Sequence, residues 1–366
     1  MAAHLYCSNK FLHKQLTDAT MKVLVDINHP AHVHYFRNFA RIMHREGHDI
    51  AFVARDKEMA HRLLSLYGIA YQGRGRGKSS KVGKFLYLLY ADLRLLQISQ
   101  QFKPDVYLNF LHPYPSQVAR LLGKTSLVFS DTEHASLHHI LTVPFATKVY
   151  TPSCYRLDLG PKHVRFNGYM ELAYLHPNYF TPNPDILLRL GLSQHEPYVI
   201  VRFVSWAAAH DYGHTGMTLA NKRRAVELMA RYARVFITSE GELPDDLEAY
   251  RIKIPFDMMH DAIYYSSLLF GESATMASEA AVLGTPSIFM DNDGRGYTDD
   301  EEHKYGLVFN FKETDQGQQN AIAQAIEILQ DRSNSKKFKE KREVLLADCI
   351  DTTQFMVDQV MQYENT

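Results

Sequence analysis

The chain has 366 residues, of which 46% are hydrophobic and 22% are charged, and this composition is typical of a globular protein with room for two domains. The formal net charge is -1 and the sequence pI is about 7.0, so no overall basic field indicates nucleic acid as a partner. The three cysteines, Cys7, Cys154 and Cys349, form no metal or redox spacing, which favours free thiols in a reducing cytoplasm.

The sequence contains no apolar run that could span a bilayer, because the nearest candidate, FLYLLYADLRLLQI, is too short and includes Asp92 and Arg94. Residues 1–20 lack the apolar core of a signal peptide. Since Met21 opens the strand-like segment MKVLVDI, we expect residues 1–20 to be a disordered extension that precedes the natural start. We expect a cytoplasmic protein and leave open a peripheral contact with the inner face of the membrane.

Short apolar runs alternate with amphipathic runs in the first part of the chain. Strands are expected at 22–27, 49–55, 69–72, 105–110, 126–131 and 148–153. Helices are expected at 31–46, 57–68 and 115–123, with a further long helix before the strand at 105–110. Strands that alternate with helices predict parallel βαβ units with right-handed crossovers.

The alternation breaks at 166–187, where Pro, Asn and aromatic residues show no period, and then resumes. Strands are expected at 198–204, 234–239, 251–254, 268–273 and 286–290, and helices at 222–233, 258–267 and 275–284. A helical tail follows, whose charged run KKFKEKRE is interpreted as a solvent-exposed face. We therefore predict an α/β protein with two Rossmann-like parallel-sheet domains that face each other across a cleft and bind ligands at the carboxyl ends of their strands. The expected boundaries are 21–170 and 191–330 for the domains, 171–190 for a linker and 331–366 for the tail.

The basic segment QGRGRGKSS imitates a phosphate-binding loop. A P-loop needs Gly, four residues and then Gly-Lys-Ser/Thr, and counting back from Gly77, Lys78 and Ser79 places Gln72 where the first Gly is required. The backbone N–H groups would lose their register. We therefore expect a flexible basic loop that meets an anionic acceptor or only water.

Three histidines follow the first strand in DINHPAHVHYF: His29, His32 and His34. Their spacing does not match HExxH, so no metal site is expected. One interpretation is that the histidines line a polar turn. The other is ligand contact, because a helix N-terminus lowers the pKa of a nearby histidine and neutral imidazole can act as a general base. Asp26, at the strand end, would orient or replace that base.

The segment SDTEHASLHH follows another strand end, at Ser130. Asp131, Glu133 and His134 would face the same cleft as the histidines. The alternative is that Asp131 or Thr132 caps a helix with an acidic first turn.

The segment VRFVSWAAAHDYGHTGM opens the second series of strands. Its strand ends at Ser205 and Trp206, beside a small, polar loop. The indole would either pack in the core or cover a base or sugar ring. Arg202 and His210 are candidates to neutralise phosphate.

The segment GESATMASEAAVLGTPSIFM begins at Gly271 and places small residues between a strand end and a helix. Ser273, Ala274 and Thr275 stand where the free N–H groups and positive dipole end of a helix bind anions. Glu279 lies about one turn into the helix, where a carboxylate can accept bonds from two vicinal hydroxyls. Pyrophosphate at the helix start and ribose at the carboxylate describe a nucleoside diphosphate. The alternative is a capped helix with a surface glutamate.

This last segment resembles the nucleotide-sugar site of glycosyltransferase-B proteins, which include the peptidoglycan N-acetylglucosaminyltransferase and the UDP-N-acetylglucosamine 2-epimerases. Together with VLVDINHPAHVHYFRNF, SDTEHA, GYMELAYLHP and RFVSWAAAHD, it resembles the family called domain of unknown function 354, from about Met21 to about Phe311. The resemblance implies the glycosyltransferase-B fold, with an N-terminal acceptor domain and a C-terminal nucleotide-sugar domain. NHPAHVH lacks the paired glycines of the peptidoglycan enzyme's first loop, so its acceptor geometry is not carried over.

The resemblance implies a metal-independent glycosyltransferase that moves a sugar from a nucleoside-diphosphate donor to a saccharide or lipid-linked acceptor in surface polysaccharide or glycolipid synthesis. No metal and no cofactor are expected, since a helix dipole and a cation would stabilise the diphosphate. Candidate base or acceptor contacts are Asp26, His32, His34 and Glu133. Candidate nucleotide-sugar contacts are Gly271, Ser273, Ala274, Thr275, Glu279, Arg202 and Ser205. The alternatives are a UDP-N-acetylhexosamine 2-epimerase and a non-catalytic nucleotide-sugar-binding protein.

Overall fold

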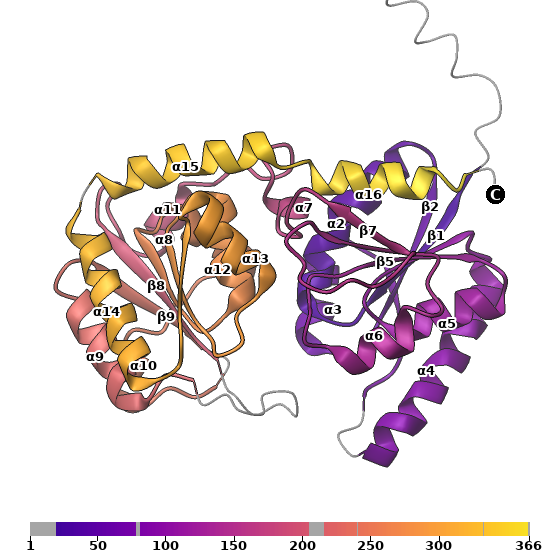
Figure 1. Cartoon of the computed structure of the whole chain (residues 1–366), viewed down its shortest axis with the longest axis horizontal. Helices are drawn as coiled ribbons and strands as arrows, with labels where there is room; N and C mark the ends of the chain where they lie inside the picture. The colour runs from indigo at the N-terminus through magenta and orange to yellow at the C-terminus, as the bar shows by residue number, and fades with distance from the viewer. Residues whose placement is uncertain (1–19, 78–80, 205–215, 240, 332, 365–366) are drawn as a thin grey trace, which may run out of the picture. The chain divides into compact units, whose positions relative to one another are not determined.

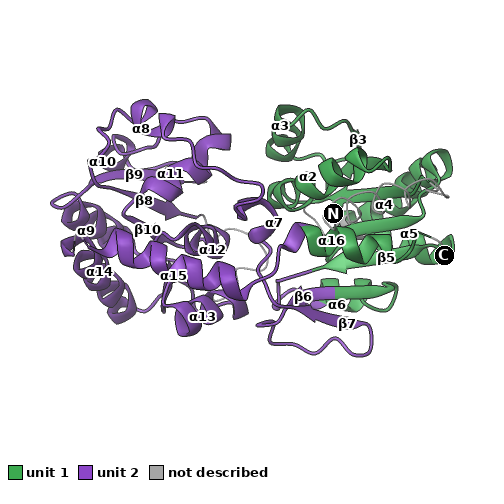
Figure 2. Ribbon diagram, turned by 90° about the horizontal axis from the view of Figure 1, so that it is seen from above, with its two compact units in different colours: residues 1–129, 137–149, 354–366 green, residues 130–136, 150–353 purple. Residues whose placement is uncertain are grey.

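A computed structural model describes residues 20–77, 81–204, 216–239, 241–331 and 333–364, and Figure 1 labels many of its elements. The chain forms two compact units (Figure 2). Unit 1 comprises Met1–Phe129, Leu137–Val149 and Gln354–Thr366, and unit 2 comprises Ser130–Ser136 and Tyr150–Thr353. The predicted α/β class with two parallel sheets is confirmed.

The first sheet has the strand order β3-β2-β1-β4-β5-β6-β7. The strands are β1 (Lys22–Ile27), β2 (Asp49–Ala54), β3 (Tyr71–Gly73), β4 (Val106–Phe110), β5 (Thr125–Phe129), β6 (Lys148–Pro152) and β7 (His163–Phe166). β1 pairs in parallel with β2 on one side and with β4 on the other. The winding of the chain therefore reverses between β1 and β4, and such a switch point opens a crevice at the carboxyl ends of the strands.

The helices of this part of the chain begin and end at local signals. They are α2 (Pro30–Arg45), α3 (Glu58–Leu66), α4 (Lys81–Phe102), α5 (Pro113–Leu121), α6 (Ser136–Thr142) and α16 (Thr352–Met361). In α2, His29 is the N-cap and accepts a bond from the N–H of Ala31 at 3.3 Å, and Pro30 is the first helical residue. Gly47, with φ of 93°, follows the last turn.

The sheet of unit 2 has the order β12-β11-β10-β8-β9. The strands are β8 (Tyr198–Phe203), β9 (Arg234–Ser239), β10 (Leu268–Gly271), β11 (Ser287–Met290) and β12 (Val308–Phe311). The helices are α7 (Leu172–Leu175), α8 (Asp185–Arg189), α9 (Leu219–Met229), α10 (Asp245–Glu248), α11 (Met259–Tyr265), α12 (Ala274–Leu283), α13 (Gly296–Asp300), α14 (Asp315–Gln330) and α15 (Asn334–Asp348), with a 3-10 turn η1 (Phe256–Met258) and a π-helical turn η2 (Glu301–Tyr305). β10 pairs with β8 and β11, so the switch point of this sheet lies between β8 and β10.

The core of unit 2 is formed by side chains of the sheet and of helices α9 and α14. Val201, Ile237 and Phe270 contribute from the strands, and Val226 and Ile322 from the helices, all buried. Parallel strands covered on their faces read as continuous apolar runs, which is why the sequence predicted them.

Two segments of unit 2 differ from the sequence prediction. The expected linker, 171–190, contains the helices α7 and α8. Every side chain of LAYL in α7 is buried, and such packing stabilises a short helix. The strand expected at 251–254 makes a single bridge, between Ile237 and Arg251.

The charged run KKFKEKRE in α15 is only partly solvent-exposed, contrary to the sequence interpretation. Lys339 Nζ donates to the carbonyl oxygens of Tyr264 at 3.1 Å and Leu283 at 2.7 Å, and Arg342 Nε donates to that of Val282 at 2.9 Å. These carbonyls belong to the last turns of α11 and α12. The carbonyl groups at the C-terminus of a helix lack partners within the helix and favour cations. The run therefore binds α15 to the C-terminal ends of α11 and α12.

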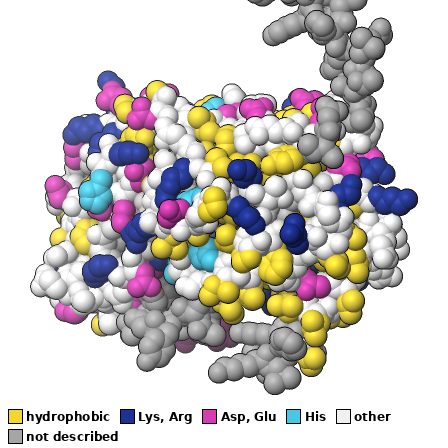
Figure 3. All heavy atoms as spheres, turned by 45° about the vertical axis from the view of Figure 1, so that its right-hand side comes forward, with side chains coloured by type: hydrophobic (Ala, Val, Ile, Leu, Met, Phe, Trp, Pro, Cys, Tyr) yellow, Lys and Arg dark blue, Asp and Glu magenta, His cyan; other side chains and the backbone are white. Residues whose placement is uncertain are grey.

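Helix α4 carries an exposed apolar stripe. Leu86, Leu89, Tyr90 and Leu93 recur at helical spacing and are between 46% and 68% exposed. Hydrophobic side chains gather on the lower part of the face seen in Figure 3. We call Leu86, Leu89, Tyr90 and Leu93 the α4 stripe. Within the described ranges, no helix is long and apolar enough to cross a membrane.

Candidate functional site

Helix α12 begins at the switch point of unit 2, directly after β10. Ser273 is its N-cap, and Ser273 Oγ accepts a bond from the N–H of Met276 at 3.4 Å. Ala274 and Thr275 form the first turn and are only half-buried. Because the first N–H groups of a helix have no partners within it, this turn offers N–H donors and a positive dipole end to an anion.

Close packing of two strands explains the glycine before this helix. A Cβ atom on Gly271 would lie 2.2 Å from the carbonyl oxygen of Arg202 on the neighbouring strand. The absence of a side chain at Gly271 therefore lets β10 lie close to β8, and this packing positions α12. Arg202 Nη1 donates to Thr238 Oγ1 at 3.2 Å. Ser205, Trp206 and His210 lie outside the described residues.

Glu279 is held by two residues that the sequence analysis did not assign. Its Oε1 accepts bonds from Tyr174 Oη at 2.7 Å and from His260 Nε2 at 2.9 Å. Glu279 is 7% exposed. Both bonds end on Oε1, so they fix the carboxylate without using Oε2. GYMELAYLHP contains Tyr174, whereas His260 stands in an amphipathic helix that gave no signal.

A second buried glutamate, Glu272, contacts Val204 after β8 and Met217 before α9. Glu272 accepts bonds from the N–H groups of Val204 at 3.0 Å and Met217 at 2.5 Å, and lies 3.4 Å from Lys222 Nζ. A cavity of about 230 Å3 lies beside it at the carboxyl ends of β8 and β9, lined by Lys222 and Leu243 among others. The strand-end motif thus contributes Glu272 as a structural anchor, a role that its spacing did not reveal.

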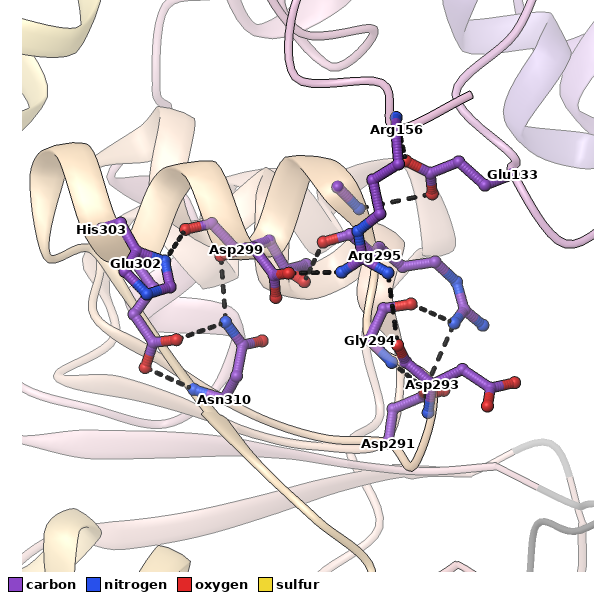
Figure 4. Close-up of polar contacts among 12 residues, drawn as sticks. Glu133, Arg156, Asp291, Asp293, Gly294, Arg295, Asp299, Glu302, His303 and Asn310 are labelled. Atoms are coloured by element: carbon purple, nitrogen blue, oxygen red, sulfur yellow. Dashed lines mark hydrogen bonds and ion pairs between the residues drawn. The ribbon is translucent and has the colours of Figure 1, made fainter. Parts of the chain in front are cut away.

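The loop after β11 contains the Asp-x-Asp sequence Asp291-Asn292-Asp293, although no Asp-x-Asp metal motif was expected from the sequence. Asp291 Oδ1 accepts bonds from the N–H groups of Asp293 and Gly294, both at 2.7 Å, and from Arg295 Nη1 at 3.2 Å (Figure 4). This carboxylate therefore closes its own loop. Among the described residues, no group of three or more potential ligand side chains could hold a metal ion.

Glu133 lies at the start of α13. Its Oε1 accepts a bond from the N–H of Arg156 at 3.1 Å, and its Oε2 accepts one from the N–H of Gly296 at 3.3 Å (Figure 4). The Arg156 guanidinium in turn pairs with Asp299. A Cβ atom on Gly296 would lie 2.3 Å from Glu133 Oε1, so the carboxylate packs closely against this helix start. The geometry points to a positioning role for Glu133.

Ser278, the residue before Glu279 on α12, lies between two buried carboxyl groups. Ser278 Oγ is 3.1 Å from Glu171 Oε2 and 2.5 Å from Glu301 Oε1. A hydroxyl has one proton to donate, so one of the two carboxyl groups must be protonated and donate to Oγ. Burial raises the pKa of both glutamates well above the usual range, and the charge of Asp131 raises that of Glu171 further.

We expect Glu301→Gln to raise the free energy of unfolding at neutral pH by about 1 kcal/mol or more. Glutamine can donate to Ser278 Oγ without holding a titratable proton. Because the folded-state pKa of Glu301 lies above its ordinary value of 4.5, its contribution to stability is complete below that pH and is lost as the pH rises through the folded-state value. The advantage of the variant should therefore grow with pH above about 4.5.

Urea denaturation at a series of pH values would measure this difference. Glu340→Gln is the control, since Glu340 is an exposed partner of Lys336 at 3.8 Å, and it should track the unmodified chain. An advantage of Glu301→Gln that shrinks with rising pH would contradict the shared-proton arrangement.

At the switch point of unit 1, Asp26 of β1 is paired in register with Asn109 of β4. Asp26 accepts two bonds from Arg74, from Nε at 2.9 Å and Nη2 at 3.1 Å, and both side chains are fully buried. Burial raises the pKa of Asp26, and the charge of Arg74 opposes that rise. Arg74 comes from the basic segment that was expected to be a flexible loop. Since both oxygens of Asp26 are occupied, the structure points to a positioning role.

His32 lies in the first turns of α2 with a defined ring orientation. Its Nδ1 accepts a bond from the N–H of Asn28 at 3.4 Å. Its ring centroid lies 4.9 Å from that of Phe110 and 6.5 Å from that of His112. Burial lowers the pKa of His32 well below its usual value, with smaller contributions from the neighbouring His29 and Lys57 side chains. The imidazole is therefore neutral near pH 7.

Asn109 and His112 are polar residues at the carboxyl end of β4, next to β1, that the sequence analysis missed. The N–H of His112 donates to Asn109 Oδ1 at 3.0 Å. His112 Nδ1 and Asn109 Nδ2 are buried and have no partner within the described part of the chain. Leu111, just before His112, has φ of 43°, a strained conformation for a residue with a Cβ. His-Pro at the start of both α2 and α5 was the signal that could have found them.

The remaining sequence candidates lie elsewhere. His34 Nδ1 is 3.5 Å from Tyr67 Oη at the end of α3, and none of the ring contacts made by His32 involves it. The structure therefore separates His34 from His32. Lys78 and Ser79 of the basic segment lie outside the described residues.

Comparison with known proteins identifies the family. The model of a family described as a protein of unknown function (DUF354) matches residues 21–365. The chain belongs to the DUF354 family. An uncharacterized protein of Methanocaldococcus jannaschii is 24% identical over 280 residues, which cover 73% of this chain and 81% of that protein. The resemblance to this family inferred from the sequence motifs is thereby confirmed.

Solved structures show which fold this DUF354 chain adopts. The UDP-GlcNAc 2-epimerase from Neisseria meningitidis bound to UDP-GlcNAc is similar with a TM-score of 0.67 at 13% identity, over 93% of this chain and 100% of that one. The spinosyn rhamnosyltransferase complexed with spinosyn aglycone is similar with a TM-score of 0.60 at 14% identity, over 93% and 100%. The DUF354 chain therefore has the glycosyltransferase-B-like architecture that glycosyltransferases and UDP-GlcNAc 2-epimerases share.

Proposed function

We propose that this DUF354 protein is a metal-independent glycosyltransferase that uses a nucleoside-diphosphate sugar as donor and a saccharide or lipid-linked acceptor of surface polysaccharide or glycolipid synthesis. The start of α12 carries the proposal, because a helix N-terminus with half-buried Ala274 and Thr275 is followed one turn later by the fixed carboxylate of Glu279. Anion and hydroxyl recognition at this spacing fit a diphosphate and a ribose. Structural neighbours that carry UDP-GlcNAc or transfer rhamnose support a nucleotide-sugar partner.

The proposal divides the roles among the described residues. In unit 2, the first turn of α12 binds the diphosphate, and Glu279 Oε2 accepts the ribose hydroxyls. The cavity beside Lys222 takes the base. In unit 1, neutral His32 acts as general base toward the acceptor hydroxyl. Gly271 positions α12 by its close approach to Arg202, whereas Asp26 holds Arg74 and Glu133 holds the start of α13.

We expect Glu279→Ala to weaken the binding of nucleoside diphosphate by about 1–3 kcal/mol, because it removes a charge-assisted acceptor. Calorimetry with UDP and GDP on the folded variant measures the effect. Tyr174→Phe is the matched comparison, since it removes one bond to Oε1 and keeps the carboxylate. It should weaken nucleotide binding less than Glu279→Ala does. Unchanged affinity for both nucleotides in Glu279→Ala would remove Glu279 from the donor site.

Incubation with a panel of nucleotide sugars tests the function itself. Release of nucleoside diphosphate together with a new glycoside is the result expected for a transferase. Binding of a nucleotide sugar without turnover over a broad panel of acceptors would replace the proposal with a non-catalytic binding role.

A UDP-N-acetylhexosamine 2-epimerase is the second candidate, because the epimerase from Neisseria meningitidis has the higher of the two TM-scores, 0.67 against 0.60. The same panel separates the reactions. Release of a free epimerised sugar would identify a hydrolysing epimerase, and exchange at C2 without release would identify a non-hydrolysing one.

The α4 stripe is our candidate for the peripheral membrane contact. Inserting its leucines into a bilayer surface would contribute about 1.5–3 kcal/mol for each fully buried side chain. Leu89→Glu together with Leu93→Glu should abolish co-sedimentation with vesicles of anionic phospholipid. Val344→Glu is the control, since Val344 is a 56% exposed apolar residue of another helix. Equal sedimentation of both variants would contradict a role for the stripe.

A further inference from the structure

A hollow of about 490 Å3 lies at the outer edge of the unit 2 sheet. Its walls come from the end of α8, from the first residues of β9 and from the segment after α10, which lie together in Figure 2. We call it the β9-edge hollow. Because Arg234 is the first residue of β9, the hollow lies toward the amino ends of the strands. The candidate donor site lies at their carboxyl ends.

The backbone of Val235 faces this hollow. β9 is the last strand of its sheet. The N–H of Arg234 donates to the carbonyl of Pro197 at 2.9 Å, so Arg234 faces β8. Since successive residues of a strand direct their peptide groups to opposite sides, Val235 must direct its N–H and C=O outward. Val235 itself is 4% exposed.

The segment after α10 forms backbone hydrogen bonds with the outer edge of β9 at Ile237. At Val235 the described chain forms none. The N–H of Ile237 donates to the carbonyl of Tyr250 at 2.8 Å, and that of Ile252 donates back to Ile237 at 2.8 Å. Helix α10 ends at Glu248 with Ala249 as its C-cap, and the N–H of Tyr250 still bonds to the carbonyl of Leu247 at 3.1 Å. The segment after α10 therefore first pairs with β9 at Ile237, two residues after Val235. In the described part of the chain, neither peptide group of Val235 has a hydrogen bond.

Four cations line the hollow, and two of them have no partner among the described residues. Arg251 is held by Glu248 at 2.6 Å, and Arg234 donates to the carbonyl of Gly191 at 3.0 Å. Arg189 and Lys253 make no ion pair or hydrogen bond with any residue that the structure describes. The lining is therefore complementary to negative charge.

We propose that the β9-edge hollow binds an extended acidic segment of a partner protein, which adds one bridge to β9 at Val235 and places carboxylates at Arg189 and Lys253. An extended backbone supplies both an acceptor for the N–H and a donor for the C=O of Val235, as in strand addition at a sheet edge. A free phosphate or carboxylate supplies only acceptors. This interaction site does not depend on the proposed donor chemistry.

Fluorescence anisotropy with a labelled Glu-Val-Glu-Val-Glu peptide tests the proposal on the full chain. Arg189→Glu together with Lys253→Glu should weaken binding about tenfold or more, because two attractions become repulsions. Lys336→Glu is the control charge reversal, because the Lys336 side chain is 85% exposed on α15, and it should leave binding unchanged. A Lys-Val-Lys-Val-Lys peptide should not bind.

Backbone recognition is tested separately. Val235→Pro removes the outward N–H without removing a bond to β8, as proline does on edge strands, and should weaken the peptide with little change in overall secondary structure. Methylation of the central peptide nitrogen should do the same without altering the protein, so the test survives a poorly folded variant. Equal binding of the methylated peptide, or insensitivity to Arg189→Glu with Lys253→Glu, would overturn the proposal in favour of a general anion patch or no site.

Discussion

Arg74→Met is expected to lower the free energy of unfolding by about 3–5 kcal/mol, because it leaves the carboxylate of Asp26 buried without its partner. The guanidinium occupies both oxygens of Asp26 at 2.9 Å and 3.1 Å and also lies 4.4 Å from the ring centroid of Tyr114. Methionine fills a similar volume, so the loss reports the charge rather than a cavity. Urea denaturation followed by circular dichroism measures it.

Two further variants separate the ion pair from packing. Asp26→Leu combined with Arg74→Met removes both charges and should recover most of the lost stability, since apolar residues often replace buried pairs at little cost. Arg62→Met, which removes an exposed pair with Glu58 at 3.9 Å, should change stability by about 0.5 kcal/mol or less. A cost for Arg74→Met near that of Arg62→Met would show that the buried pair does not stabilise unit 1.

Local rules predicted the features that depend on neighbouring residues. The strands after Met21 were visible because buried parallel strands are short apolar runs, and α12 was visible because Ser273 caps it and Gly284, with φ of 72°, ends it. The expectation of a nucleotide-binding helix rests on the same local pattern. These elements lie where the sequence placed them because caps and turns act within a few residues.

Partners distant in the sequence were not predictable from it. Arg74 reaches Asp26 across 48 residues, and Tyr174 reaches Glu279 across 105. The sequence shows a charge or a hydroxyl in each case, but fold geometry decides which group it meets. Arg74 was consequently interpreted as part of a basic loop, although it is fully buried.

The separation of His32 from His34 could have been predicted. Residues two apart on a helix do not share a face, so only one of the two can line the crevice after β1. His32 lies against Phe110 and His34 against Tyr67. The pattern HVH therefore contains one candidate base rather than two, once α2 is accepted as a helix.

His32→Ala is expected to lower turnover about a hundredfold or more, the usual scale for loss of a general base, while the affinity for nucleoside diphosphate barely changes. The contacts proposed for diphosphate and ribose belong to α12, whereas those of His32 belong to α2. His34→Ala should cost much less, because its ring faces Tyr67. Steady-state kinetics and calorimetry on the same preparations measure both quantities.

The pH profile gives this prediction its sharpest form. Burial lowers the pKa of His32 well below 6.5, so the base stays neutral as the pH falls through that value. Turnover should therefore hold on mild acidification and fall only at lower pH, and the acid limb should vanish in His32→Ala. A base with an ordinary pKa would lose activity near 6.5. Full turnover in His32→Ala, or donor affinity that falls together with stability, would return His32 to a packing role. The test would then shift to His112, whose ring lies 6.5 Å from that of His32, and to Asn109, which it contacts.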